Sequence, residues 1–168
     1  MNSKKNLVLR VIFTILFLAT CVRIFYFSAQ NGDSSGSLSR KVMRDVARVF
    51  TDDETRINQA VETGEPILRK IAHFSVYTLL GIFAMGMMST YFKNLDFDKA
   101  INKQIVISIL LGALYATSDE IHQAFVPNRS GRVIDVVLDT IGVANGTLLV
   151  AIVLAILQKH YKKIKIKK

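Results

Sequence analysis

Residues 133–157 read VIDVVLDTIGVANGTLLVAIVLAIL, and this apolar run is the strongest indication of the fold class. A helix needs about 20 predominantly apolar residues to cross a bilayer. The run is longer than that, and its only charged side chains, Asp135 and Asp139, occupy its first two turns. It therefore predicts a membrane-spanning helix that carries two carboxylates near one membrane face.

Three earlier stretches have the same character. The shortest, 104–118, is free of charge but cannot cross the hydrocarbon core alone, so its span must extend over Asp119 and Glu120. We predict an all-α, polytopic membrane protein of one domain (residues 1–168), with spans at about 7–27, 67–92, 103–123 and 133–157.

The distribution of basic residues predicts the orientation. The chain has 22 Lys and Arg against 13 Asp and Glu, and six lysines lie in the tail, 158–168. Further lysines lie at the N-terminal tip and between the second and third spans, all on one side if four spans cross the membrane. Because cytoplasmic loops are enriched in Lys and Arg, we expect a multi-pass protein of the cell membrane with cytoplasmic termini.

The partners expected from this composition are lipids. Hydrophobic residues make up 51% of the chain and the mean hydropathy is +0.33, high values for a soluble domain. The basic tail follows an apolar run, which suits an anionic inner leaflet. No basic patch with interleaved aromatic residues accompanies it, so we expect no nucleic-acid partner.

The segment of about 34–64 is predicted to be an external helical insert. Its apolar residues recur at helical spacing: Leu38, Val42, Val46, Val49 and Phe50. This pattern is typical of an amphipathic helix that lies on the membrane or caps the bundle. A capping box at 51–54 starts a second short helix, which Gly64 is expected to end before Pro66 opens the next one.

Polar side chains converge on the predicted outer face. Lys70, His73 and Tyr77 share one stripe of the second span, and Asp119, His122 and Gln123 share one stripe of the third. Glu120, Asp135, Asp139 and Arg23 lie at the same depth. Charges at membrane depth are costly and are retained when they pair or have a function. Small residues, Gly142 with Gly146 and Gly112 with Ala116, are expected to let the helices pack closely.

The order of these residues resembles the VanZ-like family. The resemblance rests on Ser28-x-Gln30, Lys70-x-x-His73-Phe74-x-x-Tyr77-x-x-Leu80-Gly81, Ser118-Asp119-Glu120-x-His122-Gln123-x-Phe125-x-Pro127-x-Arg129 and Asp135-x-x-x-Asp139-x-x-Gly142. Asn128 departs from it, because glycine is more usual there. The resemblance implies a small bacterial membrane protein associated with lowered susceptibility to teicoplanin-type antibiotics, and it implies no settled reaction.

We hypothesise an outer-face pocket that recognises or modifies a lipid-linked or glycopeptide head group. Candidate catalytic residues are His73, Asp119, Glu120, His122, Asp135 and Asp139. Candidate binding residues are Arg23, Lys70, Tyr77, Gln123, Arg129 and Arg132. No metal is expected, because Asp119-Glu120-x-His122 lacks the spacing of a zinc motif, and the need for a cofactor is left open.

Two other functions remain open at this point. The histidines and acids could relay protons in a transporter. Alternatively, the four acids and the nearby bases could form a structural ion-pair network in a scaffold protein without catalysis. Whether the protein is an enzyme is therefore undecided by its sequence.

Overall fold

The computed structural model contains helices and no strands over the residues it describes. These are residues 3–30, 32–92, 96–127, 129 and 131–166, so Asn128 lies outside them. The helices are α1 (Ser3–Ser28), α2 (Gly32–Arg48), α3 (Glu54–Ser89), α4 (Phe97–Gln123) and α5 (Val133–Ile166). Helices α1, α3, α4 and α5 are long and apolar enough to cross a membrane, which confirms the predicted fold class.

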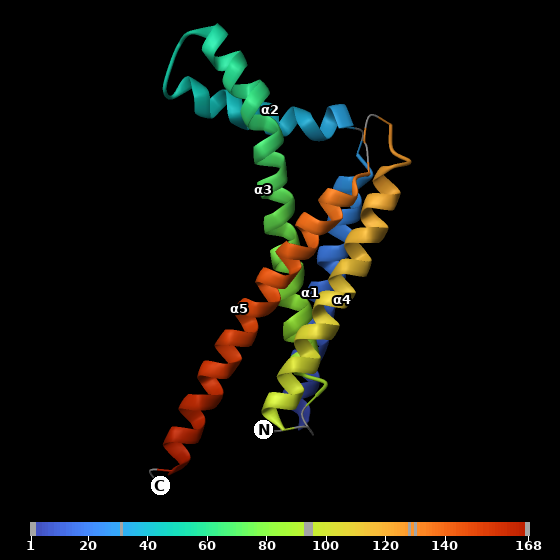
Figure 1. The fold of residues 1–168 in the computed structure, drawn as a ribbon, viewed down its shortest axis with the longest axis vertical. Helices are drawn as coiled ribbons and strands as arrows, with labels where there is room; N and C mark the ends of the chain where they lie inside the picture. Colours follow the sequence, from blue (N-terminus) through green and yellow to red (C-terminus); the bar gives the residue numbers. More distant parts are fainter. Residues whose placement is uncertain (1–2, 31, 93–95, 128, 130, 167–168) are drawn as a thin grey trace.

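Helix α3 is the centre of the bundle, since it packs against each of the other four helices. Both termini lie at one end of the bundle (Figure 1). The α1–α2 and α4–α5 connections lie at the opposite end, which we call the site end (Figure 1). This arrangement agrees with an even number of spans. The core beneath the site end contains Ile24, Tyr77, Leu80, Ala116 and Val143, contributed by all four long helices.

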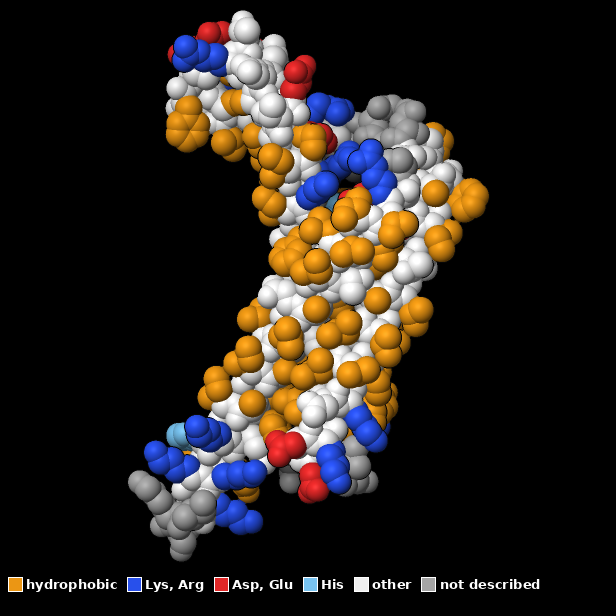
Figure 2. Space-filling view, in the orientation of Figure 1, with side chains coloured by type: hydrophobic (Ala, Val, Ile, Leu, Met, Phe, Trp, Pro, Cys, Tyr) orange, Lys and Arg blue, Asp and Glu red, His pale blue; other side chains and the backbone are white. Residues whose placement is uncertain are grey.

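The surface between the two ends is apolar. Figure 2 shows a broad apolar band on the long helices, with Lys and Arg side chains gathered above and below it. Many large apolar side chains in this band are exposed, among them Leu114, Ile141 and Ile152. Monomeric soluble proteins rarely expose an apolar surface of this extent. The chain is therefore a multi-pass membrane protein whose exposed band faces lipid.

Glycines bring α3 and α5 into backbone contact. A Cβ atom added at Gly146 would overlap with the carbonyl oxygen of Thr78, and one added at Gly81 would overlap with that of Val143. Gly112 of α4 leaves room for the Val143 side chain in the same way. The small residues therefore allow close helix packing, as their spacing predicts.

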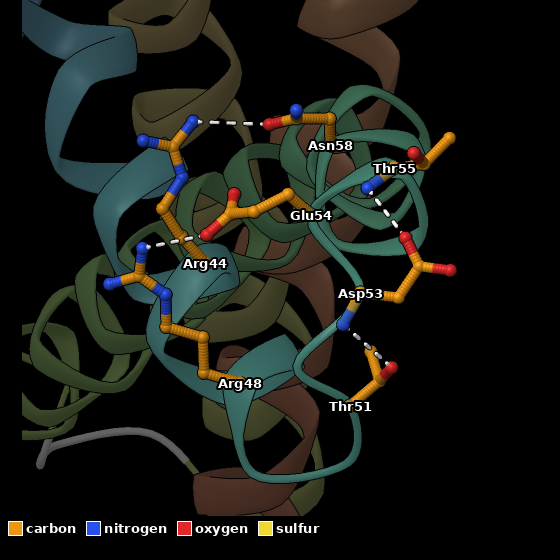
Figure 3. Close-up of polar contacts among 7 residues, drawn as sticks. All are labelled: Arg44, Arg48, Thr51, Asp53, Glu54, Thr55 and Asn58. Atoms are coloured by element: carbon orange, nitrogen blue, oxygen red, sulfur yellow. Dashed lines mark hydrogen bonds and ion pairs between the residues drawn. The ribbon is translucent and has the colours of Figure 1, made fainter.

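Helix α2 and the first turns of α3 form a hairpin that projects from the site end (Figure 1). Its small core contains Ala47, Ile57 and Val61. Side chains fix the turn (Figure 3): Arg48 pairs with Glu54 at 3.2 Å, and the Thr55 amide donates to Asp53 at 2.9 Å. Asp53 is the N-cap of α3 and the helix begins at Glu54. The capping box at 51–54 would make Thr51 the N-cap, so the helix begins two residues later than it predicts.

Helix α3 does not stop at Gly64, so the predicted break between two helices is wrong. The helix continues through Gly64 and Pro66 into the membrane span. A Cβ atom at Gly64 would overlap with the Met43 side chain of α2, so this glycine serves the packing of the hairpin. Helix α5 likewise continues beyond residue 157, through most of the basic tail to Ile166.

Candidate functional site

A cavity of about 400 Å³ opens at the site end, between α3, α4, α5 and the α4–α5 loop. This volume lies within the range of small-molecule sites, roughly 300–1,000 Å³. The lining residues are Pro66, Arg69, Lys70, His73, Glu120, Gln123, Arg129, Arg132, Asp135, Leu138 and Asp139. Most of them are charged, which distinguishes this cavity from the apolar core directly beneath it.

Four basic residues form the cationic rim of the cavity: Arg69, Lys70, Arg129 and Arg132. Lys and Arg side chains surround a hollow at this place in Figure 2. Arg69, Lys70 and Arg132 are exposed, whereas Arg129 is half-buried. Arg69 has one acidic neighbour, Glu65, at 3.8 Å in the preceding turn of α3. The rim therefore presents positive charge toward solvent.

Arg129 is the rim residue most firmly held by the protein. Its guanidinium donates to the Gln123 side chain at 3.1 Å and to the Phe27 carbonyl at 2.9 Å. Burial lowers the pKa of Arg129, and the neighbouring Arg69 cation lowers it further. An anion bound between the two guanidinium groups would offset both effects.

Three carboxylates lie deeper and form the acidic floor: Glu120, Asp135 and Asp139. Glu120 accepts the Arg132 backbone N–H at 2.9 Å, which ties the loop to α4. Asp139 is only 1% exposed, and its Oδ2 has no hydrogen-bond partner among the described residues. His73 also lines the cavity, half-buried, and its imidazole makes no hydrogen bond within the described chain.

Asp119 lies behind the cavity and joins three helices. Its Oδ2 accepts hydrogen bonds from Ser28 of α1 at 2.9 Å, Tyr77 of α3 at 3.1 Å and Gln123 of α4 at 2.9 Å. Asp119, Ser28 and Tyr77 are each at most 3% exposed. We call Asp119, Ser28, Tyr77 and Gln123 the Asp119 cluster. Asp119 and Tyr77 do not line the cavity, so the geometry favours a positioning role for both.

Two other candidate residues point elsewhere. His122 stacks on Phe25 of α1, with ring centroids 4.6 Å apart, and does not line the cavity. Arg23 is exposed and its guanidinium lies 5.7 Å from the centre of the Phe27 ring. It is also absent from the cavity lining. The structure therefore separates these two residues from the group around the cavity.

The acids are not neutralised by direct ion pairs. Among the described residues, no Lys or Arg side-chain nitrogen lies within 4.0 Å of a carboxylate oxygen of Asp119, Glu120, Asp135 or Asp139. The described chain likewise shows no group of three or more His, Cys, Asp or Glu side chains arranged to hold a metal ion. The charges are instead separated by depth, with cations at the rim and carboxylates on the floor.

Comparison with protein families identifies the chain. A family model described as VanZ/LLP1 matches residues 12–154, most of the chain. The chain belongs to the VanZ/LLP1 family. Seven of the residues that carry the family resemblance line the cavity: Lys70 and His73 from α3, Glu120 and Gln123 from α4, Arg129 from the loop, and Asp135 and Asp139 from α5. Comparisons with curated proteins and with solved structures gave no significant match.

Some residues of the site were not predicted. Arg69, Pro66 and Leu138 line the cavity, and Ser28 belongs to the Asp119 cluster. Pro66, Arg69 and His73 follow one another at spacings of three and four, so a helical stripe extended toward the N-terminus would have found Arg69. Ser28 lies far from Asp119 in sequence, and only the family-like motif singled it out.

Proposed function

We propose that this VanZ/LLP1 protein binds the anionic head group of a membrane amphiphile in the cavity at the site end. The observation that carries the proposal is the cationic rim, which comes from α3 and from the α4–α5 loop. Among the described residues, its one ion-pair partner is Glu65, beside Arg69. Arg and Lys side chains are the usual ligands of phosphate and carboxylate groups. A lipid-linked component of the bacterial cell envelope has this chemistry.

The apolar surface of the hairpin is an argument for a ligand that reaches the cavity from the membrane. Its exposed apolar residues include Leu38, Val46, Val49 and Phe50, and apolar side chains continue from its underside down the adjoining side of α3 (Figure 2). A hairpin that rests its apolar edge in the interfacial layer places the cavity at head-group depth. Pro66, Arg69, Lys70 and His73 of α3 line the cavity, and they lie in the turns of α3 that directly follow the hairpin.

We further propose that the site end faces the outside of the cell. The opposite end carries Lys4 and Lys5 of α1, Lys99 and Lys103 of α4, and the basic end of α5. Positive residues favour the cytoplasmic side. The cavity would then meet head groups of the outer leaflet, where glycopeptide antibiotics act on lipid-linked precursors. We propose that binding at this place lowers teicoplanin susceptibility, as the family resemblance implies.

Removing two rim charges is expected to weaken anion binding at least about tenfold, which corresponds to ~1.4 kcal/mol. The variant is Lys70→Gln/Arg132→Gln, because both side chains are exposed and neither makes a side-chain hydrogen bond in the described structure. The measurement is the dissociation constant of dihexanoyl phosphatidylglycerol for protein in phosphatidylcholine nanodiscs. The matched control, Lys162→Gln/Lys163→Gln, removes the same charge at the other end. Equal affinities for the three proteins would contradict the proposal.

The hairpin should contact lipid. Bimane attached to Cys at position 50, in a Cys21→Ser background, is expected to emit at shorter wavelength in vesicles and to be quenched by nitroxide lipids. Phe50 is 83% exposed and lies on the apolar side. Bimane at position 45, among the basic residues of α2, serves as the control. Similar spectra and similar quenching at the two positions would show that the hairpin stands clear of the membrane.

A cellular phenotype tests the link to antibiotics. Expression of the protein in a susceptible bacterium is expected to raise the minimum inhibitory concentration of teicoplanin severalfold. The Lys70→Gln/Arg132→Gln variant, matched for its level in the membrane, should not raise it. A variant that protects as well as the natural protein would separate this phenotype from the cavity.

The two other functions receive less support. Between the site end and the opposite end, the buried polar residues of the described core are Thr20, Gln104, Ser108 and Thr147. None of these side chains titrates, so they form no proton path across the membrane. A structural ion-pair network finds no support in the acids, which lack cationic partners within 4.0 Å among the described residues.

A further inference from the structure

The cavity has a cationic rim and an acidic floor, and the proposed anionic head group would neutralise only the charge of the rim. The exposed rim is cationic, whereas the floor carries Glu120, Asp135 and Asp139. Leaving a buried carboxylate without a partner is costly. A ligand that only carried an anion would leave this cost in place.

Asp139 is the floor carboxylate that most clearly lacks a partner. It is 1% exposed, it lines the cavity, and its Oδ2 has no hydrogen-bond partner among the described residues. Asp135, one helical turn earlier, is half-buried and likewise makes no hydrogen bond or ion pair through its side chain within the described chain. The two side chains share one stripe of α5 because they are four residues apart.

The chemistry of the floor favours an organic cation. The described residues contain no cluster of three or more ligands placed for a metal ion. Hydroxyl groups would donate hydrogen bonds but leave the negative charges of the floor unbalanced. A primary ammonium supplies one positive charge and three N–H donors, which suits carboxylates that lack both.

We propose that the ligand is a zwitterionic amphiphile whose phosphate binds the cationic rim and whose primary ammonium reaches the acidic floor. Phosphatidylethanolamine-type head groups have this structure. The inference rests on the proposed function, since it assigns the phosphate to the same rim. It adds that the floor selects for N–H donors, which a phosphate-binding site alone would not do.

A methylation series tests the selection with the unmodified protein. The probes are dihexanoyl phosphatidylethanolamine, its N-methyl and N,N-dimethyl derivatives, and dihexanoyl phosphatidylcholine, measured on protein in phosphatidylcholine nanodiscs. All four carry the same charges and differ in the number of N–H donors. We expect the affinity to fall stepwise, by about tenfold or more over the series. Equal affinities over the series would overturn the inference.

Phosphatidylglycerol distinguishes this inference from the proposed function. The protein should prefer dihexanoyl phosphatidylethanolamine to dihexanoyl phosphatidylglycerol, and in Asp139→Asn the ratio of the two dissociation constants should approach one. Asp135→Asn, at the less buried carboxylate, should also bring the ratio of the two dissociation constants closer to one. It replaces Asp139→Asn in the experiment if that variant does not fold. Binding of phosphatidylglycerol with no preference would overturn the inference and leave the proposed function standing. Binding of neither lipid would overturn both.

Discussion

Asp119→Ala is expected to lower the free energy of unfolding by about 2–4 kcal/mol, one of the two largest effects of a single substitution in this protein. Hydrogen bonds to a charged group contribute about 1.5–3 kcal/mol each, and the Asp119 carboxylate accepts three. Part of this loss is offset, because the substitution also removes a buried charge whose Oδ1 has no partner among the described residues. Ser28, Tyr77 and Gln123 would lose their common acceptor, and α1 would lose a polar contact with the bundle.

The measurement is the thermal unfolding of purified protein in detergent, followed by circular dichroism at the helical signal. Asp119→Asn keeps one acceptor oxygen in a similar shape and should lose less stability than the alanine variant. Ser118→Ala is the matched control, because Ser118 is exposed and its hydroxyl bonds only to the Tyr115 carbonyl of its own helix. An Asp119→Ala protein that melts like Ser118→Ala would refute the structural role of the cluster.

Gly146→Leu is expected to be comparably damaging, with a loss of about 3 kcal/mol or more. Overpacking a core usually costs about 1–3 kcal/mol, and more when the obstacle cannot move aside. Here the obstacle is backbone: a Cβ atom at residue 146 would overlap with the Thr78 carbonyl of α3. The α3–α5 contact would have to open. These two helices contribute seven of the eleven residues that line the cavity: Pro66, Arg69, Lys70, His73, Asp135, Leu138 and Asp139.

Asn145, the residue before Gly146, provides a control in which the same leucine side chain is introduced. Asn145 is exposed on the surface of α5, so Asn145→Leu places leucine in contact with lipid rather than with α3. Thermal unfolding and the affinity for phosphatidylglycerol should both be close to those of the natural protein for Asn145→Leu, and both should be reduced for Gly146→Leu. If the two variants behave alike, α3 and α5 are not in the close contact described here.

The long helices could be predicted because lipid imposes a strong rule on sequence. A spanning helix must be apolar over a known length, and the exposed apolar band of α1, α3, α4 and α5 follows from that rule. The structural role of Gly64 could not be predicted from such a rule. Glycine commonly ends helices, but here the side chain of Met43 occupies the space that a Cβ atom would need. Only the packing of α2 on α3 decides between the two roles.

The depth of the polar residues could also be predicted, but the direction of each side chain could not. Helical spacing placed Asp119 and His122 on one stripe of α4, together with Gln123. In the structure this stripe meets α1 through Ser28 and Phe25, while Glu120, a neighbour on the next stripe, reaches the cavity. The crossing of α1 over α4 determines this division, and a single helix pattern contains no information about which neighbour covers which stripe.

An anionic head group at the cationic rim would be seen directly in a structure of the protein determined in nanodiscs with dihexanoyl phosphatidylglycerol. We predict a phosphate within hydrogen-bond distance of at least two of the four rim residues, Arg69, Lys70, Arg129 and Arg132. The proposed function would be wrong if the cavity held no phosphate at saturating lipid, or if an acyl chain occupied it in place of the head group.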